Sequence, residues 1–413
     1  MMNQRLDEFF DETWEKYRKP LKNKTKSIVR QYDKYLLREG IIKPPQKIKT
    51  YNKGVIVLPA YPPPAVDNPI FKEPKKIAFI HEDVGHITGG RYYAYFMISA
   101  LLELGHDVTI YSNRKAVFSH EFDQYKKPKF KIVSKTASQL ATAKIPKSDV
   151  YIGSPIHGGV NAIKQAEKHN KPAYVLIFDP FPMMDKFIGK RKYTGWTHLV
   201  KGLRETDAQV ISLCNETSKY IYDWLGKERE EVHPVYPCIN SIILEQTEDQ
   251  ERQDYALFIS RLVKHKRFQD CVKACAENDI KLKVISSVNG IKEKAQEYVK
   301  EYDADVDFHL RVDDKTKFEM IKQARVIING SMFEGFGMYV AEAIACGTPF
   351  VGYDYPTFRE IRDYAKAKNI YLAKMKDADD LSDKLKQALE EKKFAEPSKE
   401  FHFEKMITRI KDI

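Results

Sequence analysis

The sequence lacks several features that would place it in other protein classes. No run of about 18 or more apolar residues occurs in it, so we expect no helix that spans a membrane. The first residues mix acids with aromatics and contain no apolar core segment, so we expect no signal peptide. Cysteine is scarce, and the five thiols are not spaced for a zinc site or a disulfide framework. We therefore expect reduced thiols in a cytoplasmic protein.

Acidic residues are almost absent from residues 16–53. This segment holds thirteen Lys and Arg against two acids, Asp33 and Glu39, while the rest of the chain is balanced at 56 of each sign. The basic residues are Lys16, Arg18, Lys19, Lys22, Lys24, Lys26, Arg30, Lys34, Arg38, Lys43, Lys47, Lys49 and Lys53. The whole charge excess of the chain lies in one segment, and this asymmetry indicates an anionic partner.

The chain before residue 76 is expected to be a basic helical extension. Apolar residues at helical spacing predict one short helix in residues 1–20 and a second over 27–37. The proline-rich run LPAYPPPAVDNP then predicts an extended connector. We assign 1–75 to this extension.

From residue 76 onward, short apolar strands alternate with helical stretches. The strands expected first are KKIAFIH, HDVTIYS, KFKIVS, SDVYIGS, PAYVLIFD and AQVISLC, and those expected later are YALFISRL, KLKVISS, VDFHL, ARVIING, TPFVGYD and NIYLA. This alternation predicts two α/β domains with doubly wound parallel sheets, over 76–240 and 241–395. A terminal helix over 396–413 is expected to cross back to the first domain. The two carboxyl edges would face a shared cleft, where ligands of such folds bind.

The most informative stretch is SMFEGFGMYVAEAIACGTP, which begins at Ser331. It reads as a glycine-rich turn after a strand, followed by a helix, whose N-terminal amide groups can hold a diphosphate. Gly335 and Gly337 carry no Cβ and so permit close approach of the backbone. Glu334 precedes the helix and Glu342 lies within it, so the two carboxylates can bind hydroxyl groups in different parts of one extended ligand.

The segment EGFGMYVAEAIACGTPFVGYD resembles the glutamate-x7-glutamate signature of the retaining glycosyltransferases of family 4, which have the GT-B fold. The match is dense over 331–352 and looser over the rest of 76–413. The resemblance implies that Glu334 contacts the donor sugar and that Glu342 contacts the nucleotide ribose.

The segment ISRLVKHKRF resembles the G-R-L-x-x-x-K-G segment of the same family. The resemblance implies that Arg261 and Lys266 neutralise the donor diphosphate, with Lys264 as an alternative to Lys266. Fixed cations stabilise the charge that the leaving nucleoside diphosphate gains as the glycosidic bond breaks. Ser260 and Arg267 stand where the family has its two glycines.

Two further segments of the second domain match the family more loosely. Arg311 and Val312 stand where the family's backbone contacts the nucleobase, although Arg311 replaces a usual glycine. Glu360 resembles the acid of a glycine-rich P-E-I corner, and we expect a structural role for it.

In the first domain, the resemblance implies that Gly89 and Gly90 form the loop that closes over the donor diphosphate and the acceptor. Asp179 stands where many family members have a histidine, so it is a candidate for binding a sugar hydroxyl or orienting the acceptor; a plain turn residue remains the alternative. His157 is a second candidate in the cleft. The catalytic residues expected are Arg261, Lys266, Glu334 and Asp179. The donor site implied comprises Gly89, Gly90, Arg261, Lys266, Arg311, Val312, Glu334, Gly335, Phe336, Gly337, Met338 and Glu342.

The resemblance implies transfer of a hexose from a nucleotide diphosphate sugar with retention at the anomeric carbon. No cofactor or metal is expected, and we interpret the acids at 303, 305 and 307 as a solvated turn. Two other functions stay open: a nucleotide-sugar epimerase of the same fold, and a non-catalytic polyanion-binding module.

The charge of the basic segment 16–53 gives an indication of the acceptor. Three binding partners of the segment remain open. Anionic lipid at the inner membrane face would suit a lipid-linked acceptor. A polyanion, such as nucleic acid or a teichoic-acid-like polymer, would bind through the same charges and interleaved aromatics. The segment could also pack against the core or a second subunit.

Overall fold

The computed structural model describes residues 69–83, 88–114, 122–189, 196–249, 251–286, 292–392 and 394–413. The basic segment 16–53, the helices predicted around it and most of the proline-rich connector lie outside these residues. The described residues form the α/β part of the chain.

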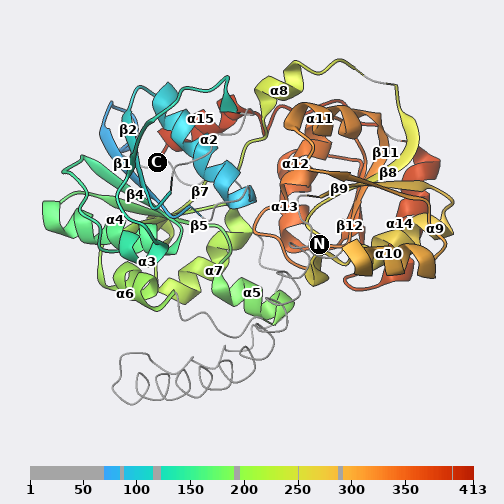
Figure 1. Cartoon of the computed structure of the whole chain (residues 1–413), viewed down its shortest axis with the longest axis horizontal. Coiled ribbons are helices and arrows are strands. Elements are labelled where there is room, and N and C mark those ends of the chain that lie inside the picture. Colours follow the sequence, from blue (N-terminus) through green and yellow to red (C-terminus); the bar gives the residue numbers. More distant parts are fainter. Residues whose placement is uncertain are drawn as a thin grey trace, which may run out of the picture. The chain divides into compact units, whose positions relative to one another are not determined.

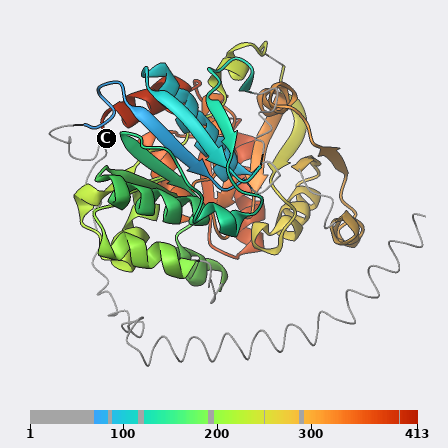
Figure 2. The same cartoon turned by 60° about the vertical axis from the view of Figure 1, so that its left-hand side comes forward.

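The first sheet is parallel and has seven strands in the order β3-β2-β1-β4-β5-β6-β7. Its strands are β1 (Lys76–His81), β2 (Asp107–Ser112), β3 (Lys129–Ile132), β4 (Val150–Ser154), β5 (Ala173–Ile177), β6 (Gln209–Ser212) and β7 (Val232–Pro234). The central strands β4 and β5 are buried at every residue, as expected for a parallel sheet that helices cover on both faces. Figure 2 shows these strands side by side, with helices coloured green over one face.

The helices of this half connect successive strands. They are α2 (Gly89–Glu103), α3 (Ala137–Leu140), α4 (Ile156–His169), α5 (Phe181–Ile188), α6 (Thr197–Glu205) and α7 (Asn215–Leu225), with a 3-10 turn at Arg229–Glu231. Thr88 caps α2 by accepting a hydrogen bond from the amide of Arg91. Helices α4, α5 and α7 are each followed by a residue in left-handed conformation, at Asn170, Gly189 and Gly226.

The second sheet is also parallel and has six strands in the order β10-β9-β8-β11-β12-β13. Its strands are β8 (Gln253–Ile259), β9 (Lys281–Ser286), β10 (Val306–Leu310), β11 (Ala324–Asn329), β12 (Phe350–Tyr353) and β13 (Ile370–Ala373). The associated helices are α9 (Phe268–Glu277), α10 (Lys292–Glu301), α11 (Asp314–Gln323), α12 (Met338–Ala345), α13 (Pro356–Tyr364) and α14 (Ala378–Glu391), with a 3-10 turn at Lys264–Lys266. Figure 1 shows this half in yellow to red.

Both sheets reverse their winding direction at one pair of neighbouring strands. In the first sheet β1 lies between β2 and β4, and in the second sheet β8 lies between β9 and β11. Ligands of doubly wound sheets bind outside the carboxyl ends of the strands at this switch point. The residues that follow β8 and β11 are the segments 260–266 and 330–337, which contain half of the predicted donor site.

The predicted fold class, two doubly wound α/β domains, is confirmed. One strand of the first sheet, β7, was not predicted from the sequence. This strand has three residues, VHP, and ends in a proline at the edge of the sheet. Such a strand is too short to show apolar periodicity, and an edge position is where a proline is tolerated.

The end of the chain lies against the first half. Helix α15 (Phe403–Lys411) contacts α2, and the ring of Phe403 meets the ring of Tyr125 edge-on at 4.8 Å. The amide of Ile70 donates to the carbonyl of Ile413 at 2.7 Å. Between the two sheets the chain passes through α8 (Ser241–Glu245), which contacts α11.

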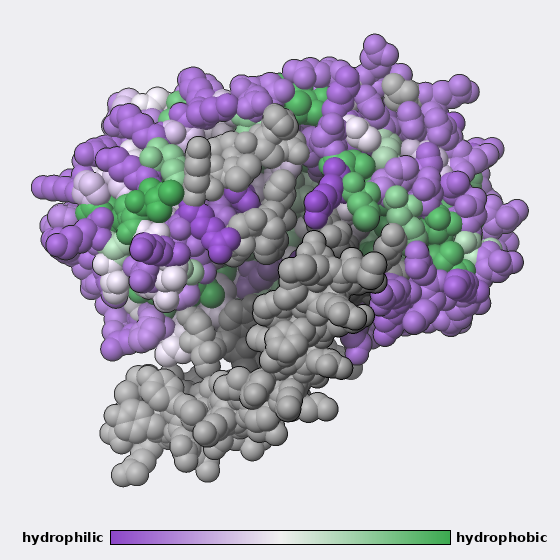
Figure 3. Space-filling view, in the orientation of Figure 1, coloured by the Kyte–Doolittle hydropathy of each residue, from purple (hydrophilic) through white to green (hydrophobic). Residues whose placement is uncertain are grey.

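On the face seen in Figure 3, hydrophilic residues cover most of the described surface, and hydrophobic residues form small separate patches. Among the described residues, none of the helices combines the length and apolar character that crossing a membrane requires.

Candidate active site

The glycine-rich turn after β11 leads directly into α12. Gly337, the residue before the helix, has a φ of 101°, and a Cβ there would lie 2.7 Å from the ring of Phe358. Both the backbone angle and the crowding require glycine at this position. No side chain of the described residues caps the helix, so its first amide groups remain available to an anion at this end.

Gly335 brings the two halves of the molecule into contact. A Cβ on Gly335 would lie 2.4 Å from the carbonyl oxygen of Phe178 and 2.6 Å from Oδ1 of Asp179, which follow β5. A Cβ on Gly90 would lie 2.7 Å from the ring of the same Phe178, whereas one on Gly89 would meet no atom of the described residues within 4 Å. Three predicted segments therefore converge at residues 178 and 179. The missing Cβ at Gly335 therefore makes room for the backbone of Phe178. The sequence had suggested only that it makes room for a ligand.

Glu334 is held at this junction by two partners. Its Oε1 forms an ion pair with Lys266 and accepts a hydrogen bond from the hydroxyl of Tyr339 at 2.6 Å. The side chains of Lys266 and Glu334 are only 7% and 14% exposed. Burial, reinforced by Glu334, raises the pKa of Tyr339 well above its usual range, so the phenol stays protonated and donates. Tyr339 was not among the predicted site residues, although it follows Glu334 closely in the same segment.

The other cations of the predicted diphosphate site are exposed. Arg261 follows β8, and its guanidinium has no ion pair or hydrogen bond with the described residues. Lys264 is exposed as well, while Lys266 is buried against Glu334. Of the two lysines left open by the sequence, Lys266 is therefore the one that the fold brings to Glu334.

Arg267 and Arg311, which stand where the resemblance predicts glycine, adopt the backbone conformation that glycine favours. Arg267 has a φ of 48° and Arg311 has a φ of 57°. A left-handed conformation costs a non-glycine residue about 1–2 kcal/mol. Two hydrogen bonds from the guanidinium of Arg267 to the carboxylate of Asp270, at 2.7 and 2.9 Å, offset part of this cost. Arg311 is exposed, and no such contact of its guanidinium is seen among the described residues.

The remaining predicted donor residues lie around the same edge of the second sheet. Phe336 is buried against Tyr236 and Phe401, so its side chain is part of the core and only its backbone can face a ligand. Val312 and Met338 are partly buried and pack on the core. Glu342 is 5% exposed and pairs with Lys317, a residue that the sequence analysis did not identify.

At the edge of the first sheet, charged residues gather at the ends of β1 and β4. Oε2 of Glu82 lies 2.9 Å from Nδ1 of His157 and accepts a hydrogen bond from the amide of the same residue at 3.0 Å. Arg91, just after the glycine pair at 89 and 90, forms a buried ion pair with Asp83 at 3.0 Å. Burial lowers the pKa of the neighbouring His81 to about 4, so its ring is neutral at pH 7. The structure thus places Asp179 beside the turn that contains Glu334 and Gly335, and it places His157 separately, beside Glu82 at the end of β1.

Glu360 connects the two halves. Its carboxylate accepts hydrogen bonds from the amides of Asn215 and Glu216, at 2.7 and 2.8 Å, and from the hydroxyl of Tyr236 at 2.5 Å. The two amides are the first of α7, where a negative charge is favoured. Burial nevertheless raises the pKa of Glu360, because three donors only partly replace its lost hydration. Glu360 therefore has a structural role: from α13 (Pro356–Tyr364) in the second half it caps the start of α7 in the first half.

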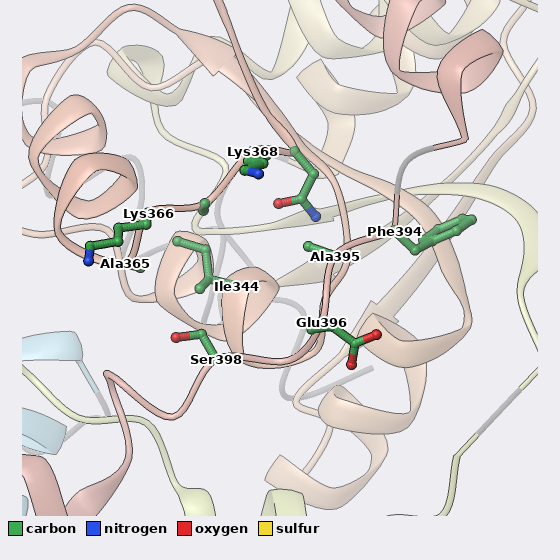
Figure 4. Close-up of a pocket in the computed structure, with 10 residues that line it drawn as sticks. Ile344, Ala365, Lys366, Lys368, Phe394, Ala395, Glu396 and Ser398 are labelled. Carbon is green, nitrogen blue, oxygen red and sulfur yellow. The ribbon is translucent and has the colours of Figure 1, made fainter.

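A cavity of about 360 Å³ lies elsewhere in the second half (Figure 4). Ile344, Lys366, Lys368 and Glu396 are among its lining residues. Ile344 lies near the end of α12, Lys366 and Lys368 precede β13, and Glu396 follows α14. None of the predicted donor residues lines the cavity. No cluster of metal-ligating side chains occurs in the part of the chain that the structure describes.

Comparisons with known proteins agree with this architecture. The family model described as "Glycosyl transferases group 1" matches residues 241–402. Sucrose-phosphate synthase from Thermosynechococcus elongatus has a TM-score of 0.61 at 15% identity, covering 81% of this chain and 94% of its own. Anabaena Alr3699/HepE in complex with UDP-glucose has a TM-score of 0.64 at 13% identity, with coverages of 81% and 98%.

The lipopolysaccharide outer core galactosyltransferase WaaB, in its apo form, has a TM-score of 0.57 at 16% identity, covering 81% of this chain and 97% of its own. No curated protein matches the sequence. At these identities the structural likenesses establish the fold, which is GT-B, and the family match concerns the second half of the chain.

Proposed function

We propose that this protein is a retaining glycosyltransferase that moves a hexose from a nucleoside diphosphate sugar to an acceptor. The observation that carries the proposal is the junction of Lys266, Glu334 and Tyr339 beside the uncapped start of α12 and next to Asp179. It combines a cation, an oriented carboxylate and free amide groups at a switch point of the sheet. The group 1 family match over 241–402 supports the same assignment.

Each group has a defined task in this proposal. Lys266, Arg261 and the amides of α12 stabilise the diphosphate as it gains charge. Glu334 binds hydroxyl groups of the donor sugar, and Glu342 binds those of the nucleotide ribose. Asp179 lies close enough to the Glu334 turn to orient the sugar or the acceptor.

The proposed reaction needs no strong base from the protein. The acceptor hydroxyl attacks the anomeric carbon on the face from which the diphosphate leaves, and the departing phosphate oxygen takes the hydroxyl proton. The new glycosidic bond forms as the bond to phosphate breaks, and the nucleoside diphosphate is released. Positioning and charge stabilisation then supply the rate enhancement.

A panel of UDP-, GDP- and dTDP-hexoses tests the proposal, beginning with UDP-glucose, which the similar Anabaena protein binds. Thermal shift measures binding, since a ligand at 100 times its Kd stabilises by about 2.7 kcal/mol. Release of nucleoside diphosphate measures turnover, and NMR of the anomeric proton in the product distinguishes retention from inversion.

The panel also separates the two alternatives. Inversion at C2 of the sugar without transfer would identify an epimerase, and no binding of any donor would favour a polyanion-binding module. For the acceptor, we propose a glycan, a lipid-linked sugar or an anionic polymer. Co-sedimentation of the full chain with anionic liposomes or with DNA across a salt series tests the contribution of residues 16–53.

A further inference from the structure

Lys317 is a largely buried cation that the donor-site motifs do not include. It belongs to α11, which lies beside α12 in Figure 1. Its Nζ donates a hydrogen bond to Oδ1 of Asp314 at 2.7 Å and lies 2.7 Å from Oε1 of Glu342. The side chain of Lys317 is 16% exposed, and those of Asp314 and Glu342 are 6% and 7% exposed. One lysine therefore pairs with two carboxylates, and all three side chains are largely buried.

Asp314 is also held from its other side. Asn240 donates to Oδ2 of Asp314 at 2.9 Å, and the hydroxyl of Tyr125 donates to Oδ1 of Asn240 at 2.8 Å. All three side chains are buried, so this chain of hydrogen bonds runs from the first half of the molecule to α11. Because both oxygens of Asp314 are engaged, the ammonium of Lys317 has a fixed position, and the oxygen of Glu342 next to it is fixed as well.

Glu342 retains one oxygen for a ligand. Oε1 faces Lys317, whereas no hydrogen bond or ion pair from the described residues reaches Oε2. Burial opposes the charged form of Lys317, but Asp314 and Glu342 outweigh this effect and raise the pKa of Lys317 well above its usual range. The three side chains together carry a net charge of about −1. A hydroxyl donor suits the remaining oxygen, while a second anion does not.

We propose that Lys317 is a positioning residue for ribose recognition: it holds Glu342 so that Oε2 accepts a hydrogen bond from the 2′- or 3′-hydroxyl of the donor nucleotide. This inference rests on the proposed function, because it takes the ligand to be a nucleoside diphosphate sugar. A carboxylate held in this way rejects an analogue that lacks the hydroxyl, because the buried oxygen then stays unpaired. Without Lys317, Glu342 is free to change rotamer, and the discrimination weakens.

The experiment measures Kd for UDP, 2′-deoxy-UDP and 3′-deoxy-UDP on the full chain by calorimetry, with the guanosine and adenosine series as further probes. In the wild type, we expect at least one deoxy analogue to bind about tenfold more weakly than its parent, or worse. In Lys317→Met, the same ratio should fall to within about threefold of one. This ratio reports on ribose contacts and is insensitive to a general loss of stability.

Lys322→Met is the matched control. Lys322 lies on the same helix with the same 16% exposure, but its Nζ donates to the carbonyl of Thr247 at 2.8 Å and does not contact Glu342. This variant should keep the wild-type ratio. If Lys317→Met does not fold, the double variant Lys317→Met/Asp314→Asn takes its place, because it keeps the net charge of the cluster. Its ratio of deoxy Kd to parent Kd should fall in the same way.

The outcomes separate the two proposals. The role of Lys317 would be overturned if Lys317→Met kept the wild-type ratio of the deoxy Kd to the parent Kd. It would also be overturned if the ratio fell equally in Lys322→Met. Nucleotide binding itself would stand in both cases. Tight binding of UDP by the wild type without any deoxy discrimination would also overturn the role of Lys317. If the wild type binds no nucleoside diphosphate, the proposed function fails and the inference falls with it.

Discussion

The carboxyl edges of the two sheets are built from different chemistry. At the edge of the second sheet, each of two carboxylates faces a lysine, in the pairs Lys266–Glu334 and Lys317–Glu342. At the edge of the first sheet, the acids pair with an arginine and a histidine, in Asp83–Arg91 and Glu82–His157. The second edge therefore offers two carboxylates that are each held by a lysine, whereas the first offers two acids held by a guanidinium and an imidazole ring.

The difference shows why one half carries a sequence signature and the other does not. In the second half, Glu334, Tyr339 and Glu342 come from one turn and the helix that follows, so their spacing is fixed in the sequence. In the first half, the polar groups come from the ends of β1, β4 and β5 and from the start of α2. Only the strand order brings these segments together.

The largest expected effect is the loss of the cation at the second edge. Lys266→Met should lower donor turnover by about 10²–10³-fold, because a preorganised charge at the leaving group is lost. It should also destabilise the protein, since removing one partner of a buried ion pair costs about 3–5 kcal/mol. Release of nucleoside diphosphate and the melting temperature measure the two effects.

Lys273→Met is the control for this variant. Lys273 is an ion-paired lysine of the same half, bound to Asp379 and Glu277 at the surface. Its replacement should leave turnover unchanged. Similar losses in both variants would show that Lys266 acts only through stability.

The next effect concerns the contact between the two edges. Gly335→Ala places a Cβ 2.4 Å from a backbone oxygen of Phe178, so the turn and the end of β5 must move apart. We expect destabilisation of about 1–3 kcal/mol and a loss of turnover of about tenfold or more. In Gly202→Ala the nearest atom is the flexible end of Ile163 at 3.1 Å, so this control should melt close to the wild type. A wild-type melting temperature and turnover for Gly335→Ala would contradict the interdomain packing.

Acidification should weaken the first half before the second. Burial lowers the pKa of both His81 and His233 from 6.5 to about 4 in the folded state. Since the unfolded chain binds these protons first, the stability is fully present above pH 6.5 and is lost as the pH falls towards 4. The loss is roughly 3 kcal/mol per histidine at its full extent.

Tryptophan fluorescence can follow this transition. Trp196 and Trp224 are both in the first half, with their rings 5.3 Å apart, and a Trp14→Phe background removes the remaining indole. His233→Gln cannot titrate and should lose less stability than its parent between pH 6.5 and 4. Parallel acid curves for the two proteins would rule out His233 as a cause.

The smallest expected effect is that of metal removal. Lys266, Arg261 and the amides of α12 supply positive charge at the proposed diphosphate site, so turnover should not require a divalent cation. We expect chelation by EDTA to change donor turnover by less than about twofold. A larger loss that added Mg²⁺ or Mn²⁺ restores would overturn this prediction.

Much of the architecture could be predicted from local patterns. All six strands of the second sheet follow apolar runs in the sequence, and the predicted helix after the glycine turn is α12. Gly347, two residues beyond the end of that helix, has a left-handed φ of 66°, a conformation that favours glycine. The exception is β7, whose three residues depend on the neighbouring strand for their extended form.

The sequence by itself determined the alternation of strands and helices, the glycine turn and the spacing of Glu334 and Glu342, because each depends on residues close together in the chain. Only the tertiary structure decided which groups these carboxylates meet. Lys317 reaches Glu342 from another helix, and Asp179 reaches Gly335 from the other sheet. No local periodicity encodes such contacts, because they depend on the strand order and on the packing of the two halves.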